Sequence, residues 1–325
     1  MNDTFRKYQT PITLLIVFNV LAVVLSKTTG VTLYLFLFSY IGTSIGVVGI
    51  LTERLPREKR TLTRRIVQLL IGIILLVYVQ FILVENLQIE GFWFYLFMGA
   101  SGGAILHYAI AKIFGPILFG RGFCGNACWT AMIIDFLPYK RSPGRISRWG
   151  RFRYVHFGIS LGLVAIAFFV FGYRPVTEFG PVPTEIYWLA IGNAVYFAIG
   201  IGLAFWLKDN RAFCKYVCPI TLFLKNTTRP SFIKINYRED KCIDCGKCDR
   251  ECPMDIRLTE YIKEGTRILS TECILCSTCV NVCPTEALYW SFKRDLGGKE
   301  YIRERETKDV SGQSPAKKVP TDTIE

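Results

Sequence analysis

Six runs of apolar residues divide the chain before residue 208, and each approaches the length of a membrane-spanning helix. The runs cover residues 11–26, 31–51, 66–84, 92–114, 154–173 and 186–207. None has Asp, Glu or Arg near its middle, and a helix of about 20 apolar residues crosses the hydrocarbon core of a bilayer. The pattern predicts a polytopic α-helical membrane protein with six spans in a lipid bilayer.

The first run resembles a signal peptide, because it is short and follows Arg6 and Lys7. Residues 24–30, however, lack the small-residue pattern of a cleavage site. We therefore expect this span to be retained.

The polar connections between the runs alternate in charge. Connections 52–65 and 139–153 are rich in Lys and Arg, whereas connections 85–91 and 174–185 are acidic or nearly neutral. Basic connections face the cytoplasm in membrane proteins. We therefore expect both termini and both basic connections on the cytoplasmic side of a prokaryotic plasma membrane. The net charge of +13 follows from this topology, and no nucleic-acid partner is expected.

The composition changes after residue 207 and indicates four modules. Residues 1–207 form the transmembrane domain, 208–231 an interfacial segment, 232–292 a compact cysteine-rich domain, and 293–325 a polar tail. The tail has few apolar residues to bury, so we expect it to be disordered. The short apolar segments 129–138 and 219–225 are expected to lie along the membrane surface.

The cysteine-rich domain repeats the spacing C-x2-C-x2-C-x3-C-P, which is the pattern of bacterial ferredoxins with two 4Fe–4S clusters. The first three cysteines of each run hold one cluster, and the fourth ligates the other cluster. The first cluster is predicted to use Cys242, Cys245, Cys248 and Cys283, and the second Cys273, Cys276, Cys279 and Cys252. The fold class of this C-terminal domain is α+β.

Zinc and disulfides are the alternatives for these eight cysteines. Disulfides are rare on the reducing cytoplasmic side of a membrane. Zinc sites use two CxxC pairs or combine Cys with His, and residues 232–292 contain no His. The spacing therefore favours iron–sulfur clusters.

Four further cysteines lie at the ends of apolar runs, in two copies of the motif Arg-x-Phe-Cys-x-x-x-Cys. The copies contain Cys124 with Cys128 and Cys214 with Cys218, each preceded by an arginine, Arg121 or Arg211. The repeat indicates an internal duplication that brings two cysteine pairs to one face of the membrane. We expect each pair to lie on one face of a helix, and the two pairs together to hold a third iron–sulfur cluster. Redox-active thiols, a copper site and inert cysteines are the alternatives.

These motifs together resemble the membrane-bound ferredoxin-type electron-transfer proteins. That family includes the quinol-oxidising partner of periplasmic nitrate reductase, the polyferredoxin half of the nitrous-oxide reductase regulator and the accessory protein of cbb-type oxidase assembly. The resemblance covers about residues 92–292 and implies electron transfer through closely spaced clusters. The family has Pro after the second cysteine of each pair. Pro219 follows Cys218, but Trp129 follows Cys128.

The expected function is electron transfer between 4Fe–4S clusters on the cytoplasmic side and a membrane redox partner, with quinone as the expected acceptor or donor. No nucleotide, flavin or catalytic motif is present, so we expect an electron-transfer subunit that works with protein partners. A copper reductase and a redox-sensing regulator are the alternatives.

A few polar residues lie in or near the spans. His107 and His156 are the only histidines, and their different expected depths argue against a shared haem. A role in quinone binding or proton transfer competes with an ordinary interhelical hydrogen bond. Asp135 is expected to be solvated, and the small residues at 99–103 are expected to allow close helix packing.

Overall fold

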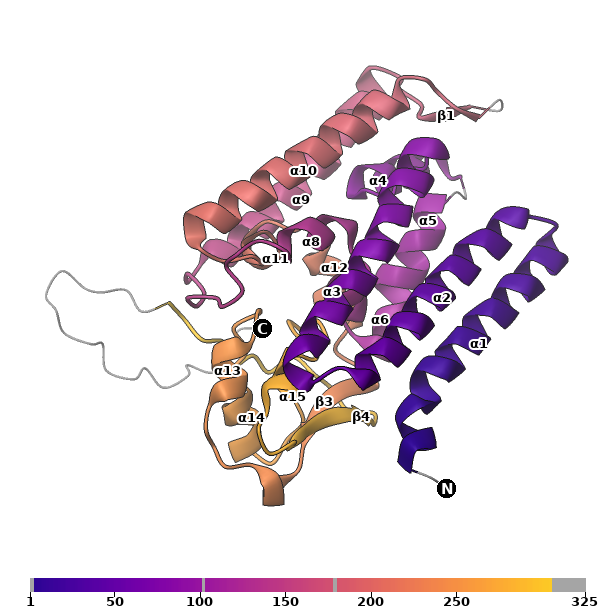
Figure 1. The fold of residues 1–325 in the computed structure, drawn as a ribbon. Helices are drawn as coiled ribbons and strands as arrows, with labels where there is room; N and C mark the ends of the chain where they lie inside the picture. The colour runs from indigo at the N-terminus through magenta and orange to yellow at the C-terminus, as the bar shows by residue number, and fades with distance from the viewer. Residues whose placement is uncertain (1–2, 101–102, 178–179, 306–325) are drawn as a thin grey trace, which may run out of the picture.

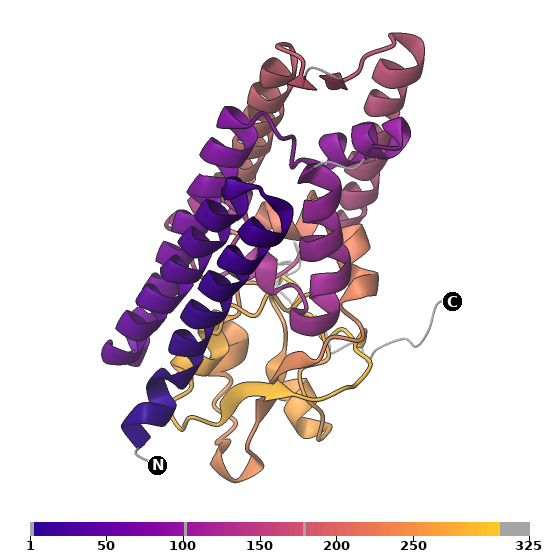
Figure 2. The ribbon, with the colours of Figure 1, turned by 90° about the vertical axis from the view of Figure 1, so that its right-hand side faces the viewer.

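The computed structural model describes residues 3–100, 103–177 and 180–305. Long helices extend from a small hairpin at one end to the cysteine-rich domain at the other end (Figure 1). The hairpin consists of β1 (Val176–Thr177) and β2 (Gly180–Pro181). In the perpendicular view of Figure 2, the hairpin again lies opposite the cysteine-rich domain. The described N-terminal end of α1 and the α2–α3 turn lie at the same end as that domain.

Five helices are long and apolar enough to cross a membrane. They are α1 (Asp3–Thr29), α2 (Thr32–Arg54), α3 (Arg57–Ile73) continued by the π-helical η1 (Ile74–Ile82), η3 (Trp149–Arg151) with α9 (Phe152–Ala165) and η4 (Ile166–Val170), and α10 (Glu185–Leu207). They coincide with five of the six predicted runs. The chain is therefore a polytopic membrane protein.

The remaining predicted span, residues 92–114, is not one straight helix. Its first part, α4 (Ile89–Met98), is bent by 119° from a second part that consists of α5 (Gly103–Tyr108), η2 (Ala109–Phe114) and α6 (Gly115–Phe119). Gly99 ends α4 in the left-handed conformation, with φ 64°, which a helix terminus commonly assigns to glycine. The prediction of a continuous span was therefore wrong at this break. The sequence did not reveal the break, because apolar residues lie on both sides of it. Residues 101–102 of the small-residue patch lie outside the described residues.

Four short helices connect the spans to the cysteine-rich domain: α7 (Gly122–Asn126), α8 (Trp129–Ile134), α11 (Ala212–Tyr216) and α12 (Thr221–Thr227). The expected surface position of segment 129–138 was wrong for α8. Five of its six residues are buried, because it packs between α3 and α10. Cys124 lies within α7 and Cys214 within α11, and Cys128 and Cys218 follow these two helices.

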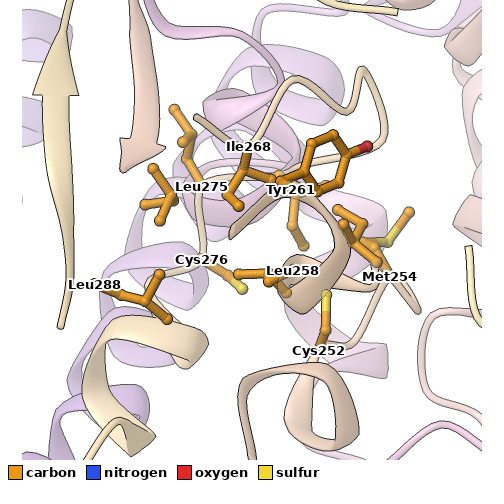
Figure 3. Packing of buried hydrophobic residues seen from close by; sticks show 11 residues of the cluster. Cys252, Met254, Leu258, Tyr261, Ile268, Leu275, Cys276 and Leu288 are labelled. Atoms are coloured by element: carbon orange, nitrogen blue, oxygen red, sulfur yellow. The ribbon is translucent and has the colours of Figure 1, made fainter. Parts of the chain in front are cut away.

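The cysteine-rich domain consists of one two-stranded sheet, short helices and two cysteine loops. The strands β3 (Ile233–Tyr237) and β4 (Leu288–Phe292) pair antiparallel, with Ile235 opposite Trp290. The helical segments are η5 (Glu239–Lys241), α13 (Lys247–Glu251), α14 (Leu258–Lys263) and α15 (Thr278–Val282). Its core is apolar and includes Cys252 and Cys276 (Figure 3).

The prediction that the chain is disordered from residue 293 onward was wrong for residues 293–305. Tyr301 and Ile302 pack against the core of the cysteine-rich domain, and the backbone of Arg305 hydrogen-bonds to that of Arg145. The Glu300 carboxylate accepts a hydrogen bond from the Thr271 amide at 2.8 Å. A few apolar residues thus suffice to attach a polar segment to an existing surface. Residues 306–325 lie outside the described residues.

Helices α1 and α2 run side by side (Figures 1 and 2) and approach each other through a row of glycines. A Cβ atom on Gly42 would lie 2.4 Å from the Phe18 Cβ, and one on Gly46 would lie 2.6 Å from the Leu15 Cβ. Gly49 is equally close to Pro11. Small residues allow this approach, because helices in lipid associate through close van der Waals packing.

The substitution Gly46→Leu is expected to separate α1 from α2. Overpacking of this kind costs about 1–3 kcal/mol, so the variant should melt at a lower temperature in detergent while it retains its iron. Gly202→Leu is the matched control, because no atom lies within 4 Å of a Cβ built on Gly202. Equal melting temperatures of the two variants would contradict the proposed packing.

Candidate metal centres

The two cysteine loops of the C-terminal domain have the same backbone conformation. Asp244 and Gly246 flank Cys245 with φ values of 47° and 63°, and Leu275 and Ser277 flank Cys276 with 50° and 57°. Left-handed residues beside right-handed ones turn successive N–H groups toward one side, which favours bound anions. A thiolate-ligated cluster is such an anion, so this backbone is suited to hold one.

Each loop borders a cavity whose cysteines come from both runs. One cavity is lined by Cys242, Cys245, Cys248 and Cys283. The other is lined by Cys252, Cys273, Cys276 and Cys279. Figure 3 shows the sulfur atoms of Cys252 and Cys276 directed into the core. The fold thus brings together the two crossed sets of four that the spacing predicts.

The donor set fits a cluster better than a single ion. Among the described residues, no three His, Cys, Asp or Glu side chains converge as one metal ion requires. A four-iron cube separates its thiolates at different corners and needs no such convergence. Burial raises the pKa of Cys273 and of Cys248 to about 12. Metal binding is therefore needed to hold these sulfurs as thiolates.

The two cavities differ in exposure. Cys245 is exposed and the neighbouring Ile243 is 63% exposed, so the first cavity lies near the surface. Cys252 and Cys276 are buried, and the second cavity lies inside the core. One site faces solvent, whereas the other faces the rest of the protein.

The two Cys-x-x-x-Cys motifs adopt the same local fold. Cys128 and Cys218 donate their backbone N–H groups to the carbonyl oxygens of Phe123 and Phe213, at 3.1 and 2.9 Å. The helix has ended before the second cysteine, so the expectation that each pair shares one helical face was wrong. Cys128 is extended, with φ −69° and ψ 123°, the conformation that a following proline would impose. Trp129 therefore leaves the motif geometry unchanged.

Three of the four cysteines gather where α8, α10 and α11 meet, and Cys124 packs against the core of the cysteine-rich domain. Cys128, Cys214 and Cys218 belong to one apolar cluster with Tyr196. Burial and the thiolates of the other three cysteines raise the pKa of Cys218 to about 12. Burial, together with Cys124 and Cys214, raises the pKa of Cys128 to about 11, against the opposing effect of Lys112. The thiols are thus close enough to repel one another when ionised.

Buried cations surround this group of cysteines. Arg211 Nη1 lies 3.9 Å from Cys214 Sγ and donates to the Cys124 carbonyl oxygen at 3.0 Å. Asp135 pairs with both Arg211 and Arg64. Asp135 is only 5% exposed, so the expectation that it is solvated was wrong. A buried carboxylate at this position holds the two arginines against the motif.

The first motif contacts the second cysteine loop directly. A Cβ atom on Gly125 would lie 2.1 Å from the Ile274 carbonyl oxygen. Cys124 packs against the core that contains Ile274, Leu275 and Cys276. The backbone of one candidate centre therefore touches the loop of another.

Charged residues fix this contact. Glu272 is 1% exposed and pairs with Arg121 at 2.7 Å, Arg153 at 2.8 Å and Arg145 at 3.0 Å. Lys215 has no exposed side-chain surface and pairs with Asp255 of the cysteine-rich domain. These pairs join the membrane domain to the cysteine-rich domain across the cysteine sites.

The histidines have separate surroundings. The His107 ring packs against Phe123 and Trp129. His156 Nδ1 lies 2.9 Å from the Val217 carbonyl oxygen, and its ring packs against Tyr196.

The sequence analysis did not identify Glu272, Arg64, Lys112 or Glu90. Tyr196 Oη donates to both carboxylate oxygens of Glu90 at 3.1 Å. Glu272 had one signal, its position directly before Cys273. The partners of the other three come from distant parts of the chain, and no sequence spacing links them.

Family models identify the cysteine segments. A model described as a 4Fe-4S dicluster domain matches residues 234–284. A second model, described as a 4Fe-4S binding domain, matches the chain twice, at residues 102–145 and 192–236. The double match confirms the internal duplication. Together the matched segments contain all 12 cysteines.

The chain is also similar to known proteins. It is 30% identical over 193 residues to the uncharacterized protein MJ0749 of Methanocaldococcus jannaschii, over 58% of this chain and 73% of that protein. It is 26% identical over 207 residues to the ferredoxin-type protein NapH of Haemophilus influenzae, over 59% and 69% respectively. It is 29% identical over 143 residues to the putative electron transport protein YccM of Escherichia coli, over 44% and 39%. No solved structure matches the chain.

The substitution Gly125→Ala is expected to weaken the contact between the first motif and the second cysteine loop. The added methyl group would meet the Ile274 carbonyl oxygen, at a cost of about 1–3 kcal/mol. Faster proteolysis between the two domains and a lower melting temperature would report this. Gly122→Ala is the control, since its Cβ would be 3.4 Å from the nearest atom, an ordinary contact. If both variants behave as the unmodified protein does, the domains do not meet as described.

Proposed function

The chain belongs to the membrane-bound ferredoxin-type electron-transfer proteins, and we propose that it passes electrons between a protein partner and the quinone pool of the membrane. One observation carries the proposal: the Gly125 backbone contacts the Ile274 carbonyl oxygen, which joins the two groups of cysteines. Iron–sulfur clusters, when bound, supply one-electron redox chemistry. The residues of this chain bind them, set their spacing and exclude water between them.

Three sets of cysteines are proposed as ligands. The two crossed sets line separate cavities in the C-terminal domain. The third set is Cys124, Cys128, Cys214 and Cys218, whose surrounding cations offset the charge of bound thiolates. One of these cations, Arg211, lies 3.9 Å from Cys214 Sγ.

The exposed set is the proposed contact with a protein partner. Cys245 and Ile243 lie at the surface, so a donor or acceptor protein can approach this set closely. The buried set containing Cys252 and Cys276 lies between it and the membrane domain. The order of the sites thus leads from solvent toward the bilayer.

Glu90 is the proposed proton acceptor for a quinol. Oxidation of a quinol releases protons together with electrons, so a membrane site needs a base. Glu90 is 9% exposed and accepts a hydrogen bond from Tyr196, which packs beside Cys128 and Cys218. Tyr196 lies near the middle of α10, which puts Glu90 inside the membrane and not in the connection expected for residues 85–91. Intramembrane carboxylates default to functional roles. Glu90 Oε is the atom that would hold the proton.

Copper reduction is less well supported. A copper ion exchanged with a carrier protein needs open thiols, and Cys214 is only 8% exposed. Burial favours a resident centre instead.

The ligand assignment predicts which site each cysteine serves. Cys252→Ser should damage the centre formed with Cys273, Cys276 and Cys279 and spare the other ferredoxin centre, as resolved by EPR of the reduced protein. Selective loss of the centre at Cys242, Cys245 and Cys248 would show that the ligation is not crossed.

If the third set of cysteines holds one cluster, a substitution in either cysteine pair should cause the same loss of iron. Cys124→Ser and Cys214→Ser should each reduce the iron content from about 12 to about 8 atoms per chain, because both would ligate one cluster of four irons. Iron and acid-labile sulfide are measured on anaerobically purified full-length protein. An unchanged iron content in both variants would exclude a cluster here and favour redox-active thiols.

Proton transfer at Glu90 predicts a rate effect without a loss of iron. Glu90→Gln should slow quinol-dependent reduction of the protein by about 10²–10⁴-fold, the usual contribution of a general base. Glu85→Gln is a matched control, because Glu85 also accepts a tyrosine hydrogen bond, from Tyr95 at 3.3 Å. Equal rates in the two variants would exclude Glu90 from the reaction.

The charge pattern predicts the orientation. Both basic connections and the cysteine-rich domain are proposed to lie in the cytoplasm of a prokaryotic cell. A reporter that is active only in the cytoplasm should be active when fused after Glu325 and inactive when inserted in the 174–184 connection. The reverse result would invert the topology.

A further inference from the structure

A cavity of about 310 Å³ opens beside the start of α9 and borders the second Cys-x-x-x-Cys motif at Lys215. It is lined by residues between 145 and 154, which lead into the start of α9, and by residues of α11 and α12. The lining residues with formal charge are Arg145, Arg148, Arg151, Arg153, Lys215, Lys225 and Glu304. Six of these seven are cationic, so the cavity is strongly basic.

The nearby carboxylates neutralise only part of this charge. Lys215 is paired with Asp209 and Asp255. Arg145, Arg153 and Lys225 all lie within 3.6 Å of the single carboxylate of Glu272. Arg148 and Arg151 are exposed, and neither side chain has an ion-pair partner among the described residues. The cavity therefore keeps an excess of positive charge.

The cavity lies at the level where α9 enters the bilayer. Phe152 and Tyr154 at the start of α9 are 51% and 61% exposed, and Trp206 near the end of α10 is 68% exposed. Trp149 contacts Trp206, with ring centroids 5.5 Å apart. Aromatic residues concentrate at the headgroup level of membranes. A ligand in the cavity is therefore beside lipid headgroups.

We propose that this cavity binds the phosphodiester group of an acidic phospholipid. Arg148, Arg151 and Lys225 attract the phosphate, and the exposed aromatic side chains border the acyl chains. Basic pockets between helices on the cytoplasmic side suit such headgroups. The arginines that hold Glu272 line the same cavity, so the bound lipid also stabilises the attachment of the cysteine-rich domain. This inference does not depend on the proposed electron-transfer partners.

The test compares two variants of the full-length protein in detergent. Arg148→Gln combined with Arg151→Gln removes two charges from the cavity. Arg54→Gln combined with Lys59→Gln removes two exposed charges from the other basic connection and is the control. Native mass spectrometry and melting temperatures are recorded with cardiolipin, phosphatidylcholine or inorganic phosphate.

Cardiolipin should bind the unmodified protein and raise its melting temperature, whereas phosphatidylcholine should not. The cavity variant should bind cardiolipin roughly 25-fold more weakly, at about fivefold for each charge, and the control variant should bind it normally. Equal weakening in both variants, or in neither, would overturn the site. Stabilisation by inorganic phosphate equal to that by cardiolipin would overturn a lipid as its ligand.

Discussion

The carboxylate of Glu272, buried among three arginines of the membrane domain, determines how the two parts of the molecule meet. A buried charge that loses its partner costs about 3–5 kcal/mol, so the domain can dock only where the arginines surround it. Glu272 precedes Cys273, and its partner Arg121 stands three residues before Cys124. The ion pair therefore sets the distance between one cysteine of each domain. Because burial removes water from both charges, the pair contributes little net stability. Its main effect is to fix the position of one domain on the other.

Burial around the cysteines follows from this attachment. The membrane domain covers the loop beside Glu272, because Gly125 lies against the Ile274 carbonyl oxygen and Gly122 lies near the buried Leu275 side chain. The loop of Cys245 stays at the surface. The two cysteine runs have the same spacing, but the run that contains Cys276 thus lies against the membrane domain and the run that contains Cys245 lies at the surface. Iron–sulfur potentials depend on solvent exposure and on charges near the sulfurs, so the two ends have different electrostatic surroundings.

Apolar run length and cysteine spacing were enough to predict five of the spans, the family and the two crossed cysteine sets that line the cavities. Run length is a local property of the chain and the cysteines have a fixed spacing, so both can be recognised without knowledge of the fold. The break at Gly99 was missed, because hydropathy is the same whether a run is straight or bent. The burial of Asp135 was also missed, since its partners Arg64 and Arg211 come from α3 and from the segment before α11. Residues 293–305 were judged on composition, but a surface formed elsewhere in the chain holds them in place.

The duplicated motif has different residues at its first position between the cysteines. Gly125 allows a close backbone contact in one copy, and Lys215 forms a buried ion pair with Asp255 in the other. Two identical copies would offer the ferredoxin domain two equivalent contact surfaces. The Ile274 carbonyl oxygen leaves no room for a side chain at Gly125, whereas the buried charge of Lys215 needs a carboxylate. The internal symmetry of the membrane domain is therefore broken at the residues that touch its partner domain, which leaves a single orientation for a domain that is itself pseudo-symmetric.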